Sequence, residues 1–158
     1  MSNTYDFGVV KNKTVLLVED TPSYQELMAV AFEENNIRDQ LYIVDNGEDA
    51  LKFLRRAEDY ANVPIPDLIL LDLDLPKING YELLKTIKQD QHLKLIPVII
   101  FTSSTQQKDI LQSYELQANC YLNKPYDLED FLTLVKTSLN FWLHCSQIPE
   151  NRGYPESI

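Results

Sequence analysis

The sequence predicts an α/β fold in which five parallel strands form a doubly wound sheet with helices on both faces. Two observations lead to this prediction. Five short aliphatic runs alternate strictly with segments whose apolar residues recur at helical spacing. The chain has 158 residues, of which 44% are hydrophobic and 24% charged, and it is long enough to bury one core without a metal or a disulfide framework.

The first half of the chain predicts two strand–helix units. Residues 14–18 (TVLLV) form an uninterrupted apolar run, which is typical of a strand covered on both faces. A helix is expected to begin at residues 21–23, because proline suits the first helical turn, and to end near Asn36. Residues 41–44 form the second strand, and the helix after it carries Ala50, Leu51, Phe53 and Leu54.

The second half predicts three more units of the same kind. Residues 68–71 form the third strand, and the helix after it carries Tyr81, Leu83, Leu84 and Ile87. Residues 98–101 form the fourth strand, before a helix around residues 110–114. Residues 120–122 form a short fifth strand, and a long fifth helix is expected at 128–143.

Composition argues against several classes of protein. Fourteen Lys and Arg against 24 Asp and Glu give a net charge of −10, and such a surface repels nucleic acids. No apolar run is long enough to span a bilayer, and the first residues lack a secretory pattern, so no membrane contact is expected. The two cysteines, Cys120 and Cys145, lack metal-ligand spacing and indicate a reducing compartment. We therefore expect a soluble cytoplasmic protein.

The chain is expected to hold one folded domain, residues 13–143. Residues 1–12 are polar and mixed and predict a loose leader, and residues 144–158 predict a polar tail with one glycine and two prolines. So short a tail leaves no room for a DNA-binding domain. The expected output is therefore through contacts with other proteins.

Polar residues that can carry out chemistry follow four of the five predicted strands. They are Glu19 and Asp20 after the first, Asp72 and Asp74 after the third, Thr102 and Ser103 after the fourth, and Lys124 after the fifth. Because parallel strands carry their carboxyl ends to one edge of a sheet, these side chains should meet in one crevice. One lysine cannot balance several carboxylates, whereas Mg²⁺ can, and it prefers oxygen ligands.

Each of these residues alone has an ordinary structural explanation. Asp20, which precedes Thr21 and Pro22, would suit the cap of a helix, and Lys124-Pro125 would suit a plain loop. Neither histidine, His92 or His144, lies near these positions, which argues against zinc or copper. A functional site is favoured because polar residues of these types follow four of the five predicted strands.

Taken in order, these residues resemble the receiver domains of two-component response regulators over roughly residues 13–143. Glu19-Asp20 resembles the family's acidic pair, and residues 72–80 (DLDLPKING) resemble the loop around its phosphoacceptor, with Asp72 in the acceptor position. Asp74 stands where Asn is common, and Asn79 where Asp is usual. The resemblance implies a flavodoxin-like sheet of strand order 2-1-3-4-5 with five helices.

Three further positions resemble the phosphate-binding and switch residues of that family. Thr102-Ser103 is similar to its switch hydroxyl with a small neighbour, and Tyr121, three residues before Lys124-Pro125, is similar to its switch aromatic. The resemblance implies that Lys124, the Thr102 hydroxyl and the Ser103 N–H bind phosphoryl oxygens. Inward movement of Thr102 would then let Tyr121 turn from an exposed to a buried position.

The same resemblance implies a reaction, a metal and a partner. Asp72 would attack a phosphohistidine of a sensor histidine kinase and become an acyl phosphate. Mg²⁺ would be held by the carboxylates of Asp20 and Asp72 and by the backbone carbonyl of Asp74, with Glu19 acting through a metal-bound water. At most, the protein would catalyse loss of its own phosphoryl group.

A narrower resemblance points to one group of these regulators. The loop at residues 60–66, the stretches 113–116 and 119–122, and Phe141-Trp142-Leu143 are similar to the single-domain regulators that partner cyanobacterial phytochromes. This resemblance implies that a phytochrome is the kinase partner.

Two other functions suit the same residues less well. A Mg²⁺-dependent phosphohydrolase that forms an aspartyl phosphate would explain Asp72 and Asp74, but the chain shows no cap domain or substrate loop. A nucleotide or flavin binder would need a glycine-rich phosphate loop, and the only glycines are at positions 8, 47, 80 and 153.

The fifth helix predicts a homodimer. One apolar stripe, expected to face the core, contains Leu128, Leu132, Val135, Leu139, Trp142 and Leu143. A neighbouring stripe contains Phe131, Leu134, Phe141 and Cys145. We expect Phe131, Leu134 and Phe141 to form a self-complementary contact with a second copy, because exposed apolar surface usually marks a partner site. The alternative is that the tail folds back over this stripe, anchored by Ile148.

Overall fold

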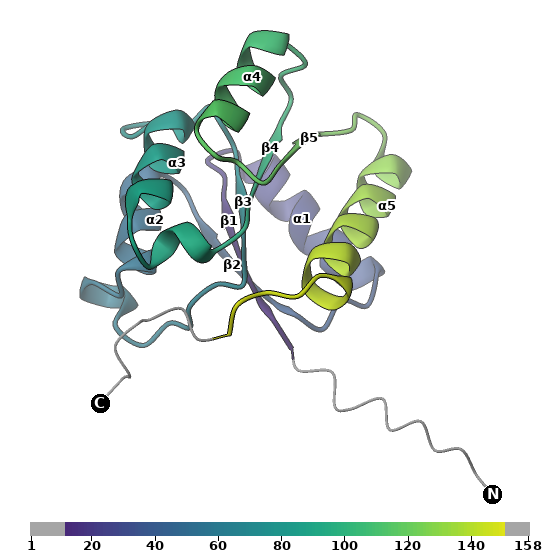
Figure 1. The fold of residues 1–158 in the computed structure, drawn as a ribbon. Coiled ribbons are helices and arrows are strands. Elements are labelled where there is room, and N and C mark those ends of the chain that lie inside the picture. The colour runs from purple at the N-terminus through teal and green to yellow at the C-terminus, as the bar shows by residue number, and fades with distance from the viewer. Residues whose placement is uncertain (1–11, 151–158) are drawn as a thin grey trace, which may run out of the picture.

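The computed structural model describes residues 12–150 and confirms the predicted α/β fold. Residues 1–11 of the predicted leader and 151–158 of the predicted tail lie outside the described residues. Five parallel strands form one sheet in the order β2-β1-β3-β4-β5 (Figure 1). The strands are β1 Thr14–Val18, β2 Gln40–Val44, β3 Leu68–Leu71, β4 Val98–Thr102 and β5 Cys120–Asn123.

Helices cover both faces of this sheet. They are α1 Pro22–Glu34, α2 Gly47–Leu54, α3 Gly80–Gln89, α4 Gln107–Glu115 and α5 Leu128–Leu139. Helices α1 and α5 lie on one face, whereas α2 and α3 lie on the other (Figure 1). None of the helices between residues 12 and 150 is long and apolar enough to cross a membrane.

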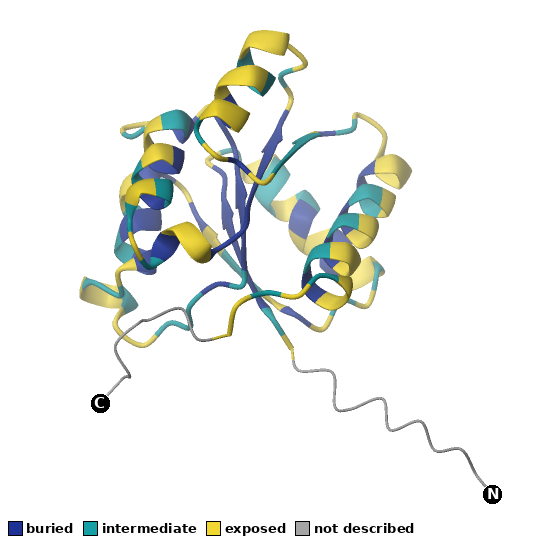
Figure 2. Cartoon of the chain, viewed as in Figure 1, coloured by how far each residue is buried: buried dark blue, intermediate teal, exposed yellow. Residues whose placement is uncertain are grey.

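The uninterrupted apolar strands are buried because both of their faces are covered. Side chains alternate along a strand, so Val15 and Leu17 pack with α1 and α5 while Leu16 and Val18 pack with α2 and α3. Every residue of β1, β3 and β4 is buried, as the dark central strands of Figure 2 show. This two-layered core fixes the positions of the residues that follow the strands.

Helix α3 begins against the loop that follows β3. Asn79 caps the helix, since its side-chain oxygen accepts a hydrogen bond of 2.9 Å from the backbone N–H of Glu82. At the next position, a Cβ on Gly80 would lie 2.5 Å from the Cα of Leu73 and 2.6 Å from the carbonyl oxygen of Asp72. Only a residue without a side chain lets α3 approach the Asp72 loop this closely.

Helix α5 turns a different face to the core from the one predicted. Phe131 is 1% exposed and its ring packs against Phe101 at a centroid distance of 5.6 Å, whereas Leu128 is 50% exposed. The prediction that Phe131 belongs to an exposed face is therefore wrong, and so is the core position of Leu128. Both stripes are apolar, so periodicity alone does not choose between them; the large ring fills space beside β4 that a leucine one turn earlier does not reach.

The end of α5 also differs from the regular helix expected to residue 143. The chain continues as a π-helical turn, Asn140–Cys145 (η3), which keeps Leu143 in the core at 2% exposure. Leu134 is half-buried against the same cluster, and Phe141 is 55% exposed. Ile148 also packs on this cluster, as expected if the tail folds back over the helix.

Candidate functional site

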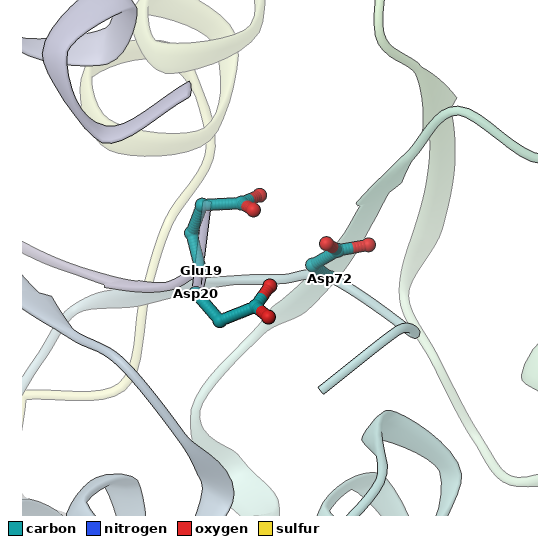
Figure 3. Close-up of side chains that lie close together, drawn as sticks. All are labelled: Glu19, Asp20 and Asp72. Carbon is teal, nitrogen blue, oxygen red and sulfur yellow. The ribbon is translucent and has the colours of Figure 1, made fainter. Parts of the chain in front are cut away.

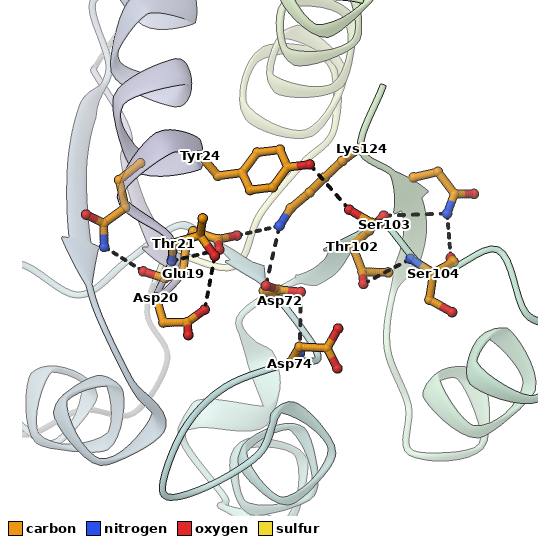
Figure 4. A network of polar contacts seen from close by, with 12 residues as sticks. Glu19, Asp20, Thr21, Tyr24, Asp72, Asp74, Thr102, Ser103, Ser104 and Lys124 are labelled. Atoms are coloured by element: carbon orange, nitrogen blue, oxygen red, sulfur yellow. Dashed lines mark hydrogen bonds and ion pairs between the residues drawn. The ribbon is translucent and has the colours of Figure 1, made fainter. Parts of the chain in front are cut away.

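The strand ends bring four buried polar side chains to one edge of the sheet (Figure 4). Glu19 follows β1, Asp72 follows β3, Thr102 ends β4 and Lys124 follows β5, and each is at most 6% exposed. Backbone hydrogen bonds continue past the strands, from the Asp72 N–H to Val18 O (3.1 Å) and from the Lys124 N–H to Thr102 O (2.8 Å). The sheet itself therefore places these side chains next to one another.

Three carboxylates form an acidic cluster at this edge. One oxygen from each of Glu19, Asp20 and Asp72 lies within 4.8 Å of the others (Figure 3). Asp20 is exposed while the other two are buried, so the cluster opens to solvent on one side only. A set of carboxylate oxygens that can be reached by water fits a hard divalent ion such as Mg²⁺.

Lys124 is the cation that the structure places inside this cluster. Its Nζ lies 2.6 Å from Glu19 Oε2 and 3.3 Å from Asp72 Oδ2, and both pairs are almost fully buried. With these groups ionised, one ammonium faces three carboxylates, so an excess of two negative charges remains. A divalent cation would neutralise that excess.

The charge of Glu19 is held at an energetic cost. Burial raises the pKa of the Glu19 carboxyl, and the negative charge of Asp72 adds to the rise, while the hydrogen bond and charge of Lys124 and the N–H of Thr21 oppose it. A buried acid beside another acid is stable as an anion only with a positive partner. This again favours a cation at the cluster.

Asp74 lies at the rim of the site rather than inside it. Its side chain is exposed, and its backbone N–H donates a hydrogen bond of 3.4 Å to Asp72 Oδ1. The predicted contribution of Asp74 is its backbone carbonyl, so an exposed side chain is compatible with that role. The bond to Asp72 helps to orient the buried carboxylate.

The loop after β4 links Thr102 to Tyr121. Thr102 Oγ1 accepts a hydrogen bond of 3.3 Å from the N–H of Ser104, and the Tyr121 hydroxyl donates to Ser104 O at 2.8 Å. Tyr121 is half-buried, and Ser103 is exposed. A movement of the Thr102 hydroxyl would therefore break a bond to the residue that also holds Tyr121.

The carboxylate of Asp109 also holds this loop in place, and the sequence does not indicate this contact. Ser104 Oγ donates to Asp109 Oδ2 (2.5 Å), and the Tyr81 hydroxyl donates to the other oxygen of the same carboxylate. These two hydrogen bonds lower the pKa of Asp109, whereas burial and the bond to Asp109 raise that of Tyr81. Nothing in the spacing of Tyr81 and Asp109 signals the contact, because they lie on different helices.

Tyr24 is the other neighbour that the sequence did not indicate. It lies in the first turn of α1 and is half-buried. In the structure its ring lies over the ammonium of Lys124, 3.9 Å from Nζ to the ring centroid.

Comparison with known proteins gives consistent matches over most of the chain. The family model described as the response regulator receiver domain matches residues 15–136. The chain is 42% identical over 137 residues to response regulator Rcp1 of a Synechocystis species, covering 87% of this chain and 93% of that protein.

Solved structures give the same picture. The crystal structure of the phosphorylated cyanobacterial phytochrome response regulator RcpA is similar at a TM-score of 0.84 and 38% identity, covering 89% of this chain and all of that one. The Mn²⁺-bound form of Rcp1 is similar at a TM-score of 0.80 and 42% identity, covering 87% of this chain and 99% of that one.

Proposed function

This chain belongs to the response regulator receiver family, and on that premise we propose that it accepts a phosphoryl group on Asp72 from a sensor histidine kinase. The observation that carries the proposal is the buried Asp72 carboxylate, 3.3 Å from the Lys124 ammonium, inside an acidic cluster at the carboxyl edge of the sheet. A carboxylate in this setting is a nucleophile with a cation beside it to receive an anionic group.

In this reaction the protein mainly positions the reacting groups and neutralises their charge. A carboxylate oxygen of Asp72 forms a bond to phosphorus while the bond from phosphorus to the histidine nitrogen breaks, which returns the electron pair to the imidazole. Lys124 pairs with a phosphoryl oxygen as a compact charge. The Thr102 hydroxyl, at the end of β4, and the Ser103 N–H, directly after it, are the proposed donors to the remaining oxygens.

We propose that Glu19, Asp20, Asp72 and the backbone carbonyl of Asp74 hold Mg²⁺ for this reaction. Mg²⁺ would supply neutralisation of charge between the acceptor and the incoming phosphoryl group. The acidic cluster and the excess of negative charge around Lys124 support this, as does the binding of Mn²⁺ by the related Rcp1.

The output is proposed to run through Thr102 and Tyr121. A phosphoryl oxygen that attracts the Thr102 hydroxyl removes it from Ser104, and Ser104 O is the acceptor of the Tyr121 hydroxyl. The two residues therefore share one element whose position a new charge would bias. The resulting surface change would be recognised by another protein.

The similarity to Rcp1 and RcpA supports a phytochrome as the kinase, acting with this chain in the cytoplasm.

We also propose a homodimer, with a smaller contact surface than the sequence predicts. Phe131 is in the core, so two of the three predicted contact residues are left to a partner: Phe141, exposed and packed edge-on to Trp142, and half-buried Leu134. Sedimentation of wild type and Phe141→Glu tests it, and a monomeric wild type with or without phosphorylation would overturn it.

Labelling with acetyl phosphate tests the central proposal. Wild type should take up one phosphoryl group, Asp72→Asn none, and Asp74→Asn, a matched change at an exposed neighbour, should still be labelled. EDTA should stop labelling because the acidic cluster then repels the anionic donor. Uptake by Asp72→Asn, or equal labelling with EDTA, contradicts the assignment, and repeated turnover of a small phosphate ester would favour the phosphohydrolase.

A further inference from the structure

The ring of Tyr24 covers the side of Lys124 that the acids leave open. The distance of 3.9 Å from Nζ to the ring centroid is well within the range of a cation–π contact (Figure 4). Tyr24 comes from the first turn of α1, and Lys124 follows β5, 100 positions later in the chain. The Tyr24 hydroxyl also lies 3.4 Å from Ser103 Oγ, so the side chain spans the site from α1 to the end of β4.

This contact completes the set of partners of the lysine. An ammonium group has three hydrogens, and around Lys124 the structure places the Glu19 carboxylate, the Asp72 carboxylate and the ring face. The lysine stem is flexible and its head rotates freely, so the head stays in place only as far as its partners hold it. The ring is the one partner of the three that is neutral.

We propose that Tyr24 is a positioning residue for phosphoryl transfer, acting through Lys124. The inference rests on the proposed role of Asp72 as acceptor. When an Asp72 oxygen bonds to phosphorus, one hydrogen of the ammonium turns to a phosphoryl oxygen while Glu19 and the ring hold the other two. A neutral ring suits this position because it leaves the positive charge of Lys124 to the incoming anion, which a third carboxylate would repel.

The test compares the rate of labelling by acetyl phosphate in two variants. Tyr24→Leu removes the ring and should slow labelling about ten- to thirtyfold, the fold-change that corresponds to a cation–π contact with a desolvated lysine. Tyr24→Phe keeps the ring face, loses only the contact to Ser103, and should label at close to the wild-type rate. Tyr114→Leu, on the outer side of α4 and 48% exposed, is the control for loss of a tyrosine elsewhere.

A double-variant cycle separates positioning from general support of α1. In a Lys124→Met background, Tyr24→Leu should cause no further loss, because the residue through which it acts is gone. A tenfold loss in that background, or a wild-type rate for Tyr24→Leu alone, would overturn the inference. If Tyr24→Leu does not fold, Tyr24→Met, also without a ring, takes its place.

If Asp72 is not the phosphoacceptor, the labelling experiment gives a different result. In that case wild type is not labelled, or Asp72→Asn is labelled as well as wild type, whatever residue stands at position 24. A labelled wild type with an insensitive position 24 rejects only the role of Tyr24.

Discussion

Two lysine ammonium groups, buried Lys124 and half-buried Lys88, lie at opposite ends of the sheet, and their partners differ in kind. At the carboxyl edge, Lys124 binds two carboxylates. At the amino edge, Lys88 of α3 donates to the carbonyl oxygens of Lys94 (3.1 Å) and Ile96 (3.0 Å) and to Asn119 Oδ1 (3.0 Å), all of them neutral. Burial lowers the pKa of Lys88 to about 8.

The difference separates a lysine that ties segments of the fold together from one at the site where we propose phosphoryl transfer. The Lys88 ammonium ties together the segment before β4 and the start of β5, and Asn119 Oδ1 also accepts from the Val98 N–H at 2.9 Å. The three hydrogens of this ammonium each have a neutral acceptor, and none of these acceptors is a carboxylate that could bind a metal ion. Around Lys124 the acids outnumber the cation, and that imbalance is what a metal and a phosphoryl group would relieve.

The largest expected difference between the two ends is in phosphorylation. Lys124→Met should slow labelling by acetyl phosphate about 100-fold, because a charge-assisted bond to the phosphoryl group is lost. Lys88→Met should leave the labelling rate unchanged. Rates for the two variants, measured side by side, check this, and equal losses would erase the distinction between the two lysines.

The second prediction concerns the stability of the amino edge. Lys88→Met removes this donor from the carbonyls of Lys94 and Ile96 and leaves Asn119 Oδ1 with the Val98 N–H alone, and it should lower the free energy of unfolding by about 2 kcal/mol. Urea unfolding of the purified protein measures this. Lys85→Met, an exposed lysine one turn earlier on the same helix, is the control and should change little. A stable Lys88→Met would mean that the three bonds contribute nothing net.

The third prediction uses the excess of acids at the carboxyl edge. Without metal, Asp20→Asn should raise the free energy of unfolding by about 1 kcal/mol, because one of three repelling charges is removed. Added Mg²⁺ should stabilise wild type and have a much smaller effect on the variant. Melting temperatures with Mg²⁺ and with EDTA test both parts, and an equal Mg²⁺ effect in the two proteins would exclude Asp20 as a ligand.

The smallest effect, a slope of at most about 1.4 kcal/mol per pH unit at each end, is on the pH dependence of stability. The pKa of Glu19 is raised above its ordinary 4.5, so the native state binds more protons there and stability falls as pH rises through that window. The pKa of Lys88 is lowered from 10.5 to about 8, so the unfolded state binds more protons between these values and stability rises with pH. Unfolding curves of metal-free wild type, Glu19→Gln and Lys88→Met should show each slope vanish only in its own variant.

The strands and the residues at their ends were predictable because both follow from short-range patterns. A short apolar run such as residues 68–71, set between segments of helical spacing, is typical of a buried strand, and parallel strands bring Glu19, Asp72 and Lys124 to one edge. The sequence gives no comparable sign for Lys88, which looks like an ordinary surface lysine on a helix. Its acceptors come from the segment before β4 and from the residue before β5.

The inner face of α5 and the role of Tyr24 depend on packing and not on periodicity. Two apolar stripes lie side by side on α5, and the contact between Phe131 and Phe101 decides which one is buried. Tyr24 fits an apolar helical pattern as well as any core aromatic does, and only the position of Lys124 shows what its ring covers. Such choices depend on side chains that are far away in the chain.

The close approach at Gly80 has a consequence for anyone who designs variants of this protein. The exposed side chain of Asp74 in this loop is open to randomisation in a library that seeks a longer- or shorter-lived phosphorylated form. Gly80 is not, because any side chain there would push against the backbone of Asp72 and Leu73. A library should therefore hold that position fixed and place its diversity on the solvent side of the loop.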